Sequence, residues 1–196
     1  MKINKNTKII GKNVILVPYR DCHVLKYHKW MTSNDLLELT CSEPLSLEEE
    51  YEMQIRWMED EDKCTFIVLD KAVNNVAKDE VASMIGDTNI FIIEKNDDSA
   101  SGEIEIMIAE ESARGKKLGW EAVILMMLYG IKYLNLHIYE AKILLKNEIS
   151  IKMFEKLQFE KYSTSKIFQE VTMRKNVTDD WVKWLEHQYK LQITEY

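Results

Sequence analysis

Gly102-Glu103-Ile104-Glu105-Ile106-Met107-Ile108, followed shortly by Arg114-Gly115-Lys116-Lys117-Leu118-Gly119, is the stretch of sequence that decides the fold. In the first part, isoleucines alternate with Glu103, Glu105 and Met107, which is the period-two pattern of a strand with one apolar face. From 118 to 134 the chain is apolar on most of its circumference, which predicts a helix buried against a sheet. The glycine-containing segment is therefore expected to be a tight turn between a strand and a buried helix.

The turn at 114–119 has the composition of an anion-binding site. Backbone N–H groups in such a turn, the helix N-terminal dipole, and the cations of Lys116 and Lys117 together suit a pyrophosphate. A basic glycine turn taken in isolation is also typical of a solvated surface turn. The sequence contains no GK[ST], GxGxxG, HExxH or GxSxG pattern, so the motifs that compete for this segment are absent.

The remaining patterns predict one mixed α/β domain over residues 1–196. Expected strands cover 9–19, 64–69, 84–93, 102–108, 138–145, a segment near 159 and 168–174, with polar joins at 71–82 and 94–101. Expected helices start at 21, 46, 118 and 147, and a C-terminal helix spans about 178–190. Neither a repeat nor a linker interrupts this order, which predicts a central sheet flanked by helices.

Ser46-Leu47-Glu48-Glu49 is a capping box that predicts the start of one of these helices. Tyr51, Ile55 and Met58 recur at helical spacing and are expected to form its buried stripe. The run Glu48-Glu49-Glu50 is interpreted as capping and solvating charge, because the helix dipole favours negative groups there.

The net charge of the chain indicates which kinds of partner it can bind. The formal charge of -7 and the pI near 5.3 argue against a nucleic-acid partner, which needs a clustered basic face. An acidic surface suits an amine-bearing acceptor, although simple solubility is the commoner explanation of such a surface.

The three cysteines, Cys22, Cys41 and Cys64, form no CxxC pair, so we expect neither a metal site nor a disulfide framework but a reducing compartment. The N-terminus lacks the apolar region of a signal peptide, and the apolar run at 122–131 is far shorter than the roughly 20 residues that span a bilayer. These observations predict a cytoplasmic protein without a membrane partner.

The turn and its context resemble the GNAT superfamily of N-acetyltransferases, whose cofactor loop follows its fourth strand with the pattern Arg/Gln-x-x-Gly-x-Gly/Ala. Arg114 and Gly119 match this pattern, and Lys117 stands where the family usually has glycine. The resemblance implies the GNAT fold, with a central, mostly antiparallel twisted sheet flanked by helices. It also implies acetyl-coenzyme A as the cosubstrate, with no metal.

A second segment, 147–159, resembles the family pattern Asn-x-x-Ser…Phe/Tyr-x-Lys-x-Gly-Phe. The matching positions are Asn147, Ser150, Lys156 and Phe159. Gln158 replaces the usual glycine, and Phe154 stands where many members carry a tyrosine that protonates the leaving thiolate. The general acid of the family is therefore not in its usual place.

The motif-bearing resemblance covers about 102–160, and the flanking elements suit the RimJ/RimL-like branch. Three further segments resemble the eukaryotic N-acetyltransferase 9-like proteins, namely Asn4-Lys5-Asn6-Thr7, Cys64-Thr65-Phe66-Ile67-Val68-Leu69-Asp70 and Phe168-Gln169-Glu170-Val171-Thr172.

The resemblance implies that the pantetheine arm pairs with the open edge of the strand at 103–109. A backbone N–H near Met107 or Ile108 then stabilises the carbonyl oxygen as it becomes negative. The implied cofactor-binding residues are Met107, Ile108, Ala109, Arg114, Gly115, Lys116, Lys117, Leu118, Gly119, Asn147, Ser150, Phe154 and Lys156.

A catalytic base is expected because an amine must be neutral to attack a thioester. Glu103 and Glu105 are the candidates, since they share the strand face opposite the isoleucines. The superfamily often places its catalytic glutamate at the start of this strand, which favours Glu103. For each, a solvent-facing strand carboxylate is the alternative. Cys64 is rejected as an acyl-carrying nucleophile, because no motif ties a histidine to it.

The resemblance implies direct attack of a primary amine, on a protein N-terminus or lysine, in a ternary complex with acetyl-coenzyme A. A protein-binding module that has lost turnover is the alternative, and a small-molecule acetylase acting on a polyamine or aminoglycoside is a third possibility. The first two differ at Glu103, because only an enzyme loses transfer on Glu103→Gln.

Overall fold

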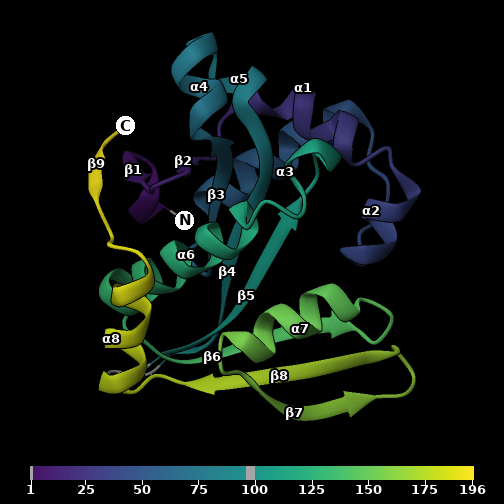
Figure 1. Cartoon of the computed structure of the whole chain (residues 1–196). Helices are drawn as coiled ribbons and strands as arrows, with labels where there is room; N and C mark the ends of the chain where they lie inside the picture. The colour runs from purple at the N-terminus through teal and green to yellow at the C-terminus, as the bar shows by residue number, and fades with distance from the viewer. Residues whose placement is uncertain (1, 96–99) are drawn as a thin grey trace.

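The computed structural model describes residues 2–95 and 100–196, and its central feature is a nine-stranded sheet with the order β7-β8-β6-β5-β4-β3-β2-β1-β9 (Figure 1). The strands are β1 (Thr7–Ile10), β2 (Val14–Pro18), β3 (Lys63–Asp70), β4 (Met84–Lys95), β5 (Ala100–Ile108), β6 (Leu136–Leu144), β7 (Glu160–Ser165), β8 (Glu170–Asn176) and β9 (Ile193–Glu195). Only β5 and β6 pair in parallel among the strands of these described residues. The predicted central, mostly antiparallel sheet is confirmed.

Helices cover both faces of this sheet. They are η1 (Lys2–Asn4), α1 (Asp21–Trp30), α2 (Asn34–Leu39), α3 (Leu47–Glu59), α4 (Lys71–Ala77), α5 (Glu80–Ser83), η2 (Glu111–Ala113), α6 (Leu118–Leu134), α7 (Glu148–Lys156) and α8 (Asp179–Gln188). One core holds α6, α7 and α8 against the isoleucine face of β5. The other holds α1, α2 and α3 against the opposite face, which carries Met107.

Helix α6 is the centre of the larger core, as its apolar sequence predicts. Its one buried carboxylate, Glu121, accepts hydrogen bonds from the backbone N–H and the side-chain amide of Asn13, both at 2.8 Å. These bonds satisfy the buried charge and tie α6 to the turn between β1 and β2.

Strands β5 and β6 pair over only part of their length. Their register runs from Ala100 opposite Leu136 to Glu103 opposite Glu140. Beyond that point β5 continues along β4, and β6 continues along β8. Figure 1 shows β5 rising away from β6, which stays with β8 and β7. We call residues 104–108 of β5 the open edge, because within the described residues they have no strand partner on the β6 side.

Three local predictions were wrong. The expected strand at 9–19 is a hairpin, in which Ile9 lies opposite Leu16. On α3, Ile55 and Met58 are about half exposed, while Glu50 and Gln54 face inward. The join at 71–82 contains α4 and α5. Of the turn expected at 94–101, residues 96–99 lie outside the described part of the chain.

Candidate active site

The open edge of β5 presents backbone groups at alternate residues. The Ala109 N–H donates to Ile85 O at 2.9 Å, and the Met107 carbonyl lies against Gly86, so both residues direct their backbone groups toward β4. Because these directions alternate along a strand, the N–H groups of Ile104, Ile106 and Ile108 face the other way. Of the two amides expected to stabilise the carbonyl oxygen, Ile108 rather than Met107 therefore faces the open side.

Arg114 fastens the turn that follows the open edge. Its guanidinium donates from Nε to Ile108 O at 2.9 Å and from Nη2 to Ala109 O at 3.1 Å. The side chain thus caps the last carbonyl of β5 and the one that follows it. Lys116 and Lys117, on the same turn, are exposed and leave two cations facing solvent.

The N-terminus of α6 carries amides without partners inside the helix. Its first intrahelical bond is donated by Glu121 N to Lys117 O, so the N–H groups of Leu118, Gly119 and Trp120 have no acceptor within α6. A Cβ on Gly119 would lie 3.0 Å from Ile108 Cγ1, so glycine allows the helix to begin directly against the end of β5. The open edge therefore leads into a turn that suits a phosphate group, and the two together fit acetyl-coenzyme A.

Two non-glycine residues hold left-handed backbone conformations where the GNAT patterns have glycine. Lys117 has φ 63° at the start of α6, and Gln158 has φ 67° after α7. The backbone shape that glycine allows is thus kept, at a cost of roughly 1–2 kcal/mol for each side chain.

The segment 147–159 contributes mainly to the packing of α7. Asn147 Oδ1 accepts from the Ser150 N–H at 3.2 Å and caps the helix, while Lys156 is exposed. Phe154 is 2% exposed and packs edge-on against Phe159, with the ring centroids 5.0 Å apart. Phe154 therefore offers packing and no proton.

Glu103 and Glu105 lie on the face opposite the isoleucines, as their spacing predicts. Glu103 Oε2 lies 2.6 Å from Lys142 Nζ, and Glu105 Oε2 lies 3.6 Å from Lys63 Nζ. Burial raises the pKa of Glu103, and Lys142 opposes this rise only in part. Both expected bases are thus held by lysines.

Sequence reasoning missed two acidic residues on this face, Asp87 of β4 and Glu50 of α3, which are 3% and 1% exposed. Asp87 lies opposite Met107, and its Oδ2 accepts from Asn89 Nδ2 at 2.6 Å. Burial is the main cause that raises the pKa of Asp87 to about 7. A charged residue inside the apolar run 84–93 is the signal that could have revealed it, because isolated buried charges are costly.

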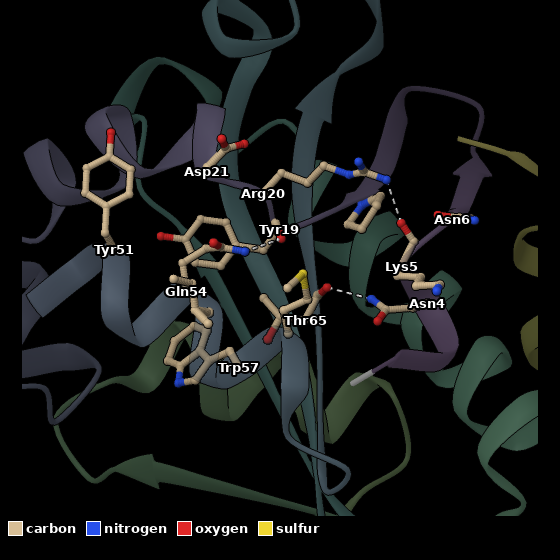
Figure 2. Close-up of a pocket in the computed structure, with 13 residues that line it drawn as sticks. Asn4, Lys5, Asn6, Tyr19, Arg20, Asp21, Tyr51, Gln54, Trp57 and Thr65 are labelled. Carbon is tan, nitrogen blue, oxygen red and sulfur yellow. Dashed lines mark hydrogen bonds between the residues drawn. The ribbon is translucent and has the colours of Figure 1, made fainter.

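A cavity of about 510 Å³ lies on the same face of the sheet, between η1, the end of β2 and α3 (Figure 2). Figure 2 shows the aromatic side chains of Tyr19, Tyr51 and Trp57 around it. The Gln54 side-chain amide crosses it to donate to Tyr19 O at 3.0 Å, and Asn4 donates to Thr65 O at 2.7 Å. These bonds fasten α3 and η1 to the strands beneath them.

Two groups of reactive side chains have structural explanations. The Arg20 N–H donates to His23 Nδ1, which leaves the proton on Nε2, and this nitrogen donates to Glu80 at 2.8 Å. Of the neighbouring Cys22, His23 and Glu80, the last two thus form a hydrogen-bonded link between α1 and α5. Cys64 is buried, and burial raises the pKa of its thiol to about 12, which disfavours the thiolate.

None of the helices in the described ranges, 2–95 and 100–196, has the length and apolar character needed to cross a membrane.

Solved structures with the same fold include acetyltransferases. A spermidine N-acetyltransferase from Vibrio cholerae, in complex with CoA and spermine, aligns with a TM-score of 0.70 at 19% identity, over 87% of this chain and 98% of that chain. The ribosomal L7/L12 alpha-N-protein acetyltransferase RimL aligns with a TM-score of 0.66 at 13% identity, over 86% and 95%. At these identities the likeness concerns the fold.

Sequence comparison identifies closer relatives. The acetyltransferase (GNAT) domain family matches residues 13–160. The alpha/beta-tubulin-N-acetyltransferase 9 of Homo sapiens is 52% identical over 199 residues, covering 100% of this chain and 93% of the relative. The protein of the same name from Drosophila melanogaster is 47% identical and is covered over its full length. The chain therefore belongs to the GNAT acetyltransferases and, among them, to the N-acetyltransferase 9 family of N-acetyltransferases.

Proposed function

We propose that this N-acetyltransferase transfers the acetyl group of acetyl-coenzyme A to a primary amine on a protein, at an N-terminus or a lysine, by direct attack in a ternary complex. One observation carries the cofactor assignment: the open edge of β5, at 104–108, leads directly to amides at the start of α6 that have no acceptor within the helix. An extended amide-bearing arm that ends in a pyrophosphate matches this arrangement. When bound, acetyl-coenzyme A supplies the acetyl group as a thioester.

Each part of the chain then has a defined task. The amides of Leu118 and Gly119, with Lys116 and Lys117, hold the phosphates. The backbone of Ile104 and Ile106 aligns the pantetheine arm. The Ile108 N–H is placed to stabilise negative charge on the carbonyl oxygen.

The acceptor is proposed to be a protein amine, because the relatives at 52% and 47% identity are named for alpha/beta-tubulin. Four carboxylates, Glu50, Asp87, Glu103 and Glu105, lie on the acceptor face beside Lys63 and Lys142, and their negative character attracts an ammonium group. An α-amino group, with a pKa of about 8, is easier to neutralise than a lysine side chain at about 10.4. Tubulin with free N-termini is therefore the first acceptor to test.

We place the reaction in the cytoplasm. The thiols of Cys22, Cys41 and Cys64 are free in the structure, which suits a reducing compartment.

A protein-binding module is the second candidate, because Phe154 lacks the hydroxyl that many GNAT members use and is buried in the core. In that case the fold and cofactor binding persist without turnover. Acetylation of an amine substrate separates the two candidates.

Titration calorimetry with acetyl-coenzyme A tests the cofactor site, with wild type beside Gly119→Glu and Gln188→Glu. Gly119→Glu adds a side chain against Ile108 and a negative charge at the phosphate position, so we expect loss of binding. Gln188→Glu adds the same charge at an exposed position, the last residue of α8, and is expected to bind as wild type does. Absence of binding by folded wild type would overturn the proposed enzyme.

Acceptor assays then compare purified tubulin, tubulin blocked at its N-termini, and spermine. Acetylation of tubulin supports a protein acceptor, and its loss on blocking assigns the α-amine. Acetylation of spermine alone would point to a small-molecule acetylase, and cofactor binding without any transfer would favour the binding module.

A further inference from the structure

Four polar side-chain atoms in the described part of the chain are buried without a hydrogen-bond partner. They are Tyr19 Oη, His28 Nδ1, Glu50 Oε2 and Asp87 Oδ1. They come from the end of β2, from α1, from α3 and from β4, all on the face that carries Met107. Buried polar atoms are normally satisfied, so four in one layer require an explanation.

These atoms belong to neighbouring elements of one layer. The rings of Tyr19 and Tyr27 lie 5.1 Å apart, and His28 Nδ1 lies 3.8 Å from Glu50 Oε1. Burial raises the pKa of Tyr19 well above its ordinary range, and the charges of Glu50 and Asp87 raise it further. Asp87 lies opposite Ile67, which packs in the same core as Tyr19 and Tyr27. Gln54, one helical turn after Glu50 on α3, donates to Tyr19 O, so both carboxylates lie near Tyr19.

The two carboxylates are poorly matched by cations of the protein. Lys63, the cation that acts on Asp87, contacts Glu105 at 3.6 Å and lies 4.0 Å from the centre of the Trp57 ring. Among the residues that the structure describes, Glu50 has only the longer contact to His28, at 3.8 Å. Burying a charge without a close cation is unfavourable, so the arrangement is complementary to a cation that arrives from outside.

An ammonium group matches the buried acceptor atoms and aromatic rings of this layer. It has three N–H donors, and Glu50 Oε2, Asp87 Oδ1 and Tyr19 Oη can each accept one. The rings of Tyr19 and Tyr27 add aromatic faces, which attract cations. His28, which contacts Glu50, is 26% exposed, and Glu105, two residues before Met107, is 48% exposed, so solvent reaches residues beside both carboxylates.

We infer that Tyr19, Tyr27, Glu50 and Asp87 form the acceptor-amine site, in which Glu50 binds the ammonium group and Asp87 removes its proton. This inference rests on the proposed acetyl transfer and names its amine site. We call these four residues the amine cluster.

The proton step is balanced within the cluster. One N–H bond of the acceptor R–NH₃⁺ breaks and an O–H bond forms on the Asp87 carboxylate, directly or through one water, which leaves R–NH₂ with a free lone pair and a neutral carboxylic acid. Asp87 lies opposite Met107, whose neighbours Ile106 and Ile108 direct their amides to the open edge. The neutral amine is thereby formed beside the segment proposed to hold the thioester.

The groups around Asp87 place its titration near neutral pH. Burial raises its pKa to about 7, with Glu105 raising it further, while the Asn89 hydrogen bond and Lys63 oppose the rise. Burial, and after it the charges of Asp87 and Glu50, raise the pKa values of the nearby Tyr19 and Tyr27. A base with a pKa near the working pH is well suited to take a proton and release it again.

The test uses Asp87→Asn and Glu50→Gln in the full chain, with tubulin as acceptor and acetyl-coenzyme A binding measured in parallel. We expect Asp87→Asn to lower kcat by about 100-fold or more and to abolish the fall in rate below a pH of about 7, while Asp87→Glu restores part of the rate. We expect Glu50→Gln chiefly to raise KM for tubulin, by about tenfold. Glu94→Gln on β4 and Glu52→Gln on α3 are exposed controls, expected to match wild type.

The inference is overturned if Asp87→Asn transfers acetyl groups at a rate within about twofold of wild type and with the same pH profile. In that case the cofactor site works and only the role of Asp87 is wrong. Absence of acetyl-coenzyme A binding by the folded wild-type protein would instead overturn the proposed function. A second measurement needs no variant: n-butylammonium should compete with tubulin on the wild-type enzyme, and neutral n-butanol should not. Equal competition by both would also overturn the amine cluster.

Discussion

Glu103 of β5 and Lys142 of β6 form an ion pair of 2.6 Å across the point where their two strands part. Glu103 is the last residue of β5 in register with β6, opposite Glu140. The pair therefore joins the two strands at the inner end of the open edge, where the pantetheine arm is proposed to lie. Each charge supports the ionised form of the other, and the Glu103 carboxylate raises the pKa of Lys142.

Replacing Glu103 by Gln is expected to lower acetyl transfer by roughly tenfold, because the strands lose their charged link and the acceptor side loses negative charge. Steady-state assays on Glu103→Gln, Lys142→Met and the double variant measure the effect. If the pair acts as a unit, the double variant should be no worse than the more damaging single one. A Glu103→Gln enzyme as active as wild type would contradict this role. If neither wild type nor the variant transfers acetyl groups, the binding module is favoured.

The stability of the protein should depend on pH through Asp87. Its pKa rises from 3.8 to about 7 on burial, so the folded protein keeps a proton that the unfolded chain releases. Stability associated with this group is therefore complete below a pH of about 4 and is lost as the pH rises through about 7.

Asp87→Asn removes this penalty. The variant is expected to exceed wild type in free energy of unfolding by roughly 2–4 kcal/mol at a pH of about 8, with a smaller difference at about 5. Urea denaturation at both pH values measures it. If the difference in free energy of unfolding between Asp87→Asn and wild type is the same at both pH values, Asp87 does not titrate in this range.

Lys117→Gly should stabilise the fold and weaken cofactor binding. Lys117 holds φ 63°, and glycine removes roughly 1 kcal/mol of backbone strain there. The lost cation should weaken acetyl-coenzyme A binding several-fold, more so at low salt. Lys116→Gly, which removes a cation from a residue without a left-handed backbone, should weaken binding without any gain in stability. Denaturation and calorimetry on both variants check the two effects.

Phe154→Tyr should not create a general acid. The ring is 2% exposed and packs on Phe159, so an added hydroxyl is buried without a partner known from this structure. We expect a loss of roughly 1–3 kcal/mol in stability and no gain in kcat. Thermal unfolding and kinetics test this. A rise in kcat with unchanged stability would show that the hydroxyl reaches the leaving group.

Local patterns in the sequence determined much of the fold. Alternation at 102–108 specified β5, the apolar circumference of 118–134 specified α6, and the glycine-containing turn between them specified where the phosphates are proposed to bind. Ser46 and Glu49 also form the expected capping box. Such features depend on residues within a few positions of one another, so spacing alone determines them.

Tertiary structure alone decided the environment of each charge. Glu50 and Glu49 are adjacent on α3, yet Glu49 caps the helix and Glu50 faces the buried layer, because α1 and β3 lie against only one side of α3. Asp87 likewise becomes distinctive only when Met107, twenty positions later, lies opposite it. Whether a carboxylate is buried depends on contacts between distant segments, and burial sets its pKa. The sequence therefore identified the strand and the turn, while the packing of α1 and α3 identified the amine cluster.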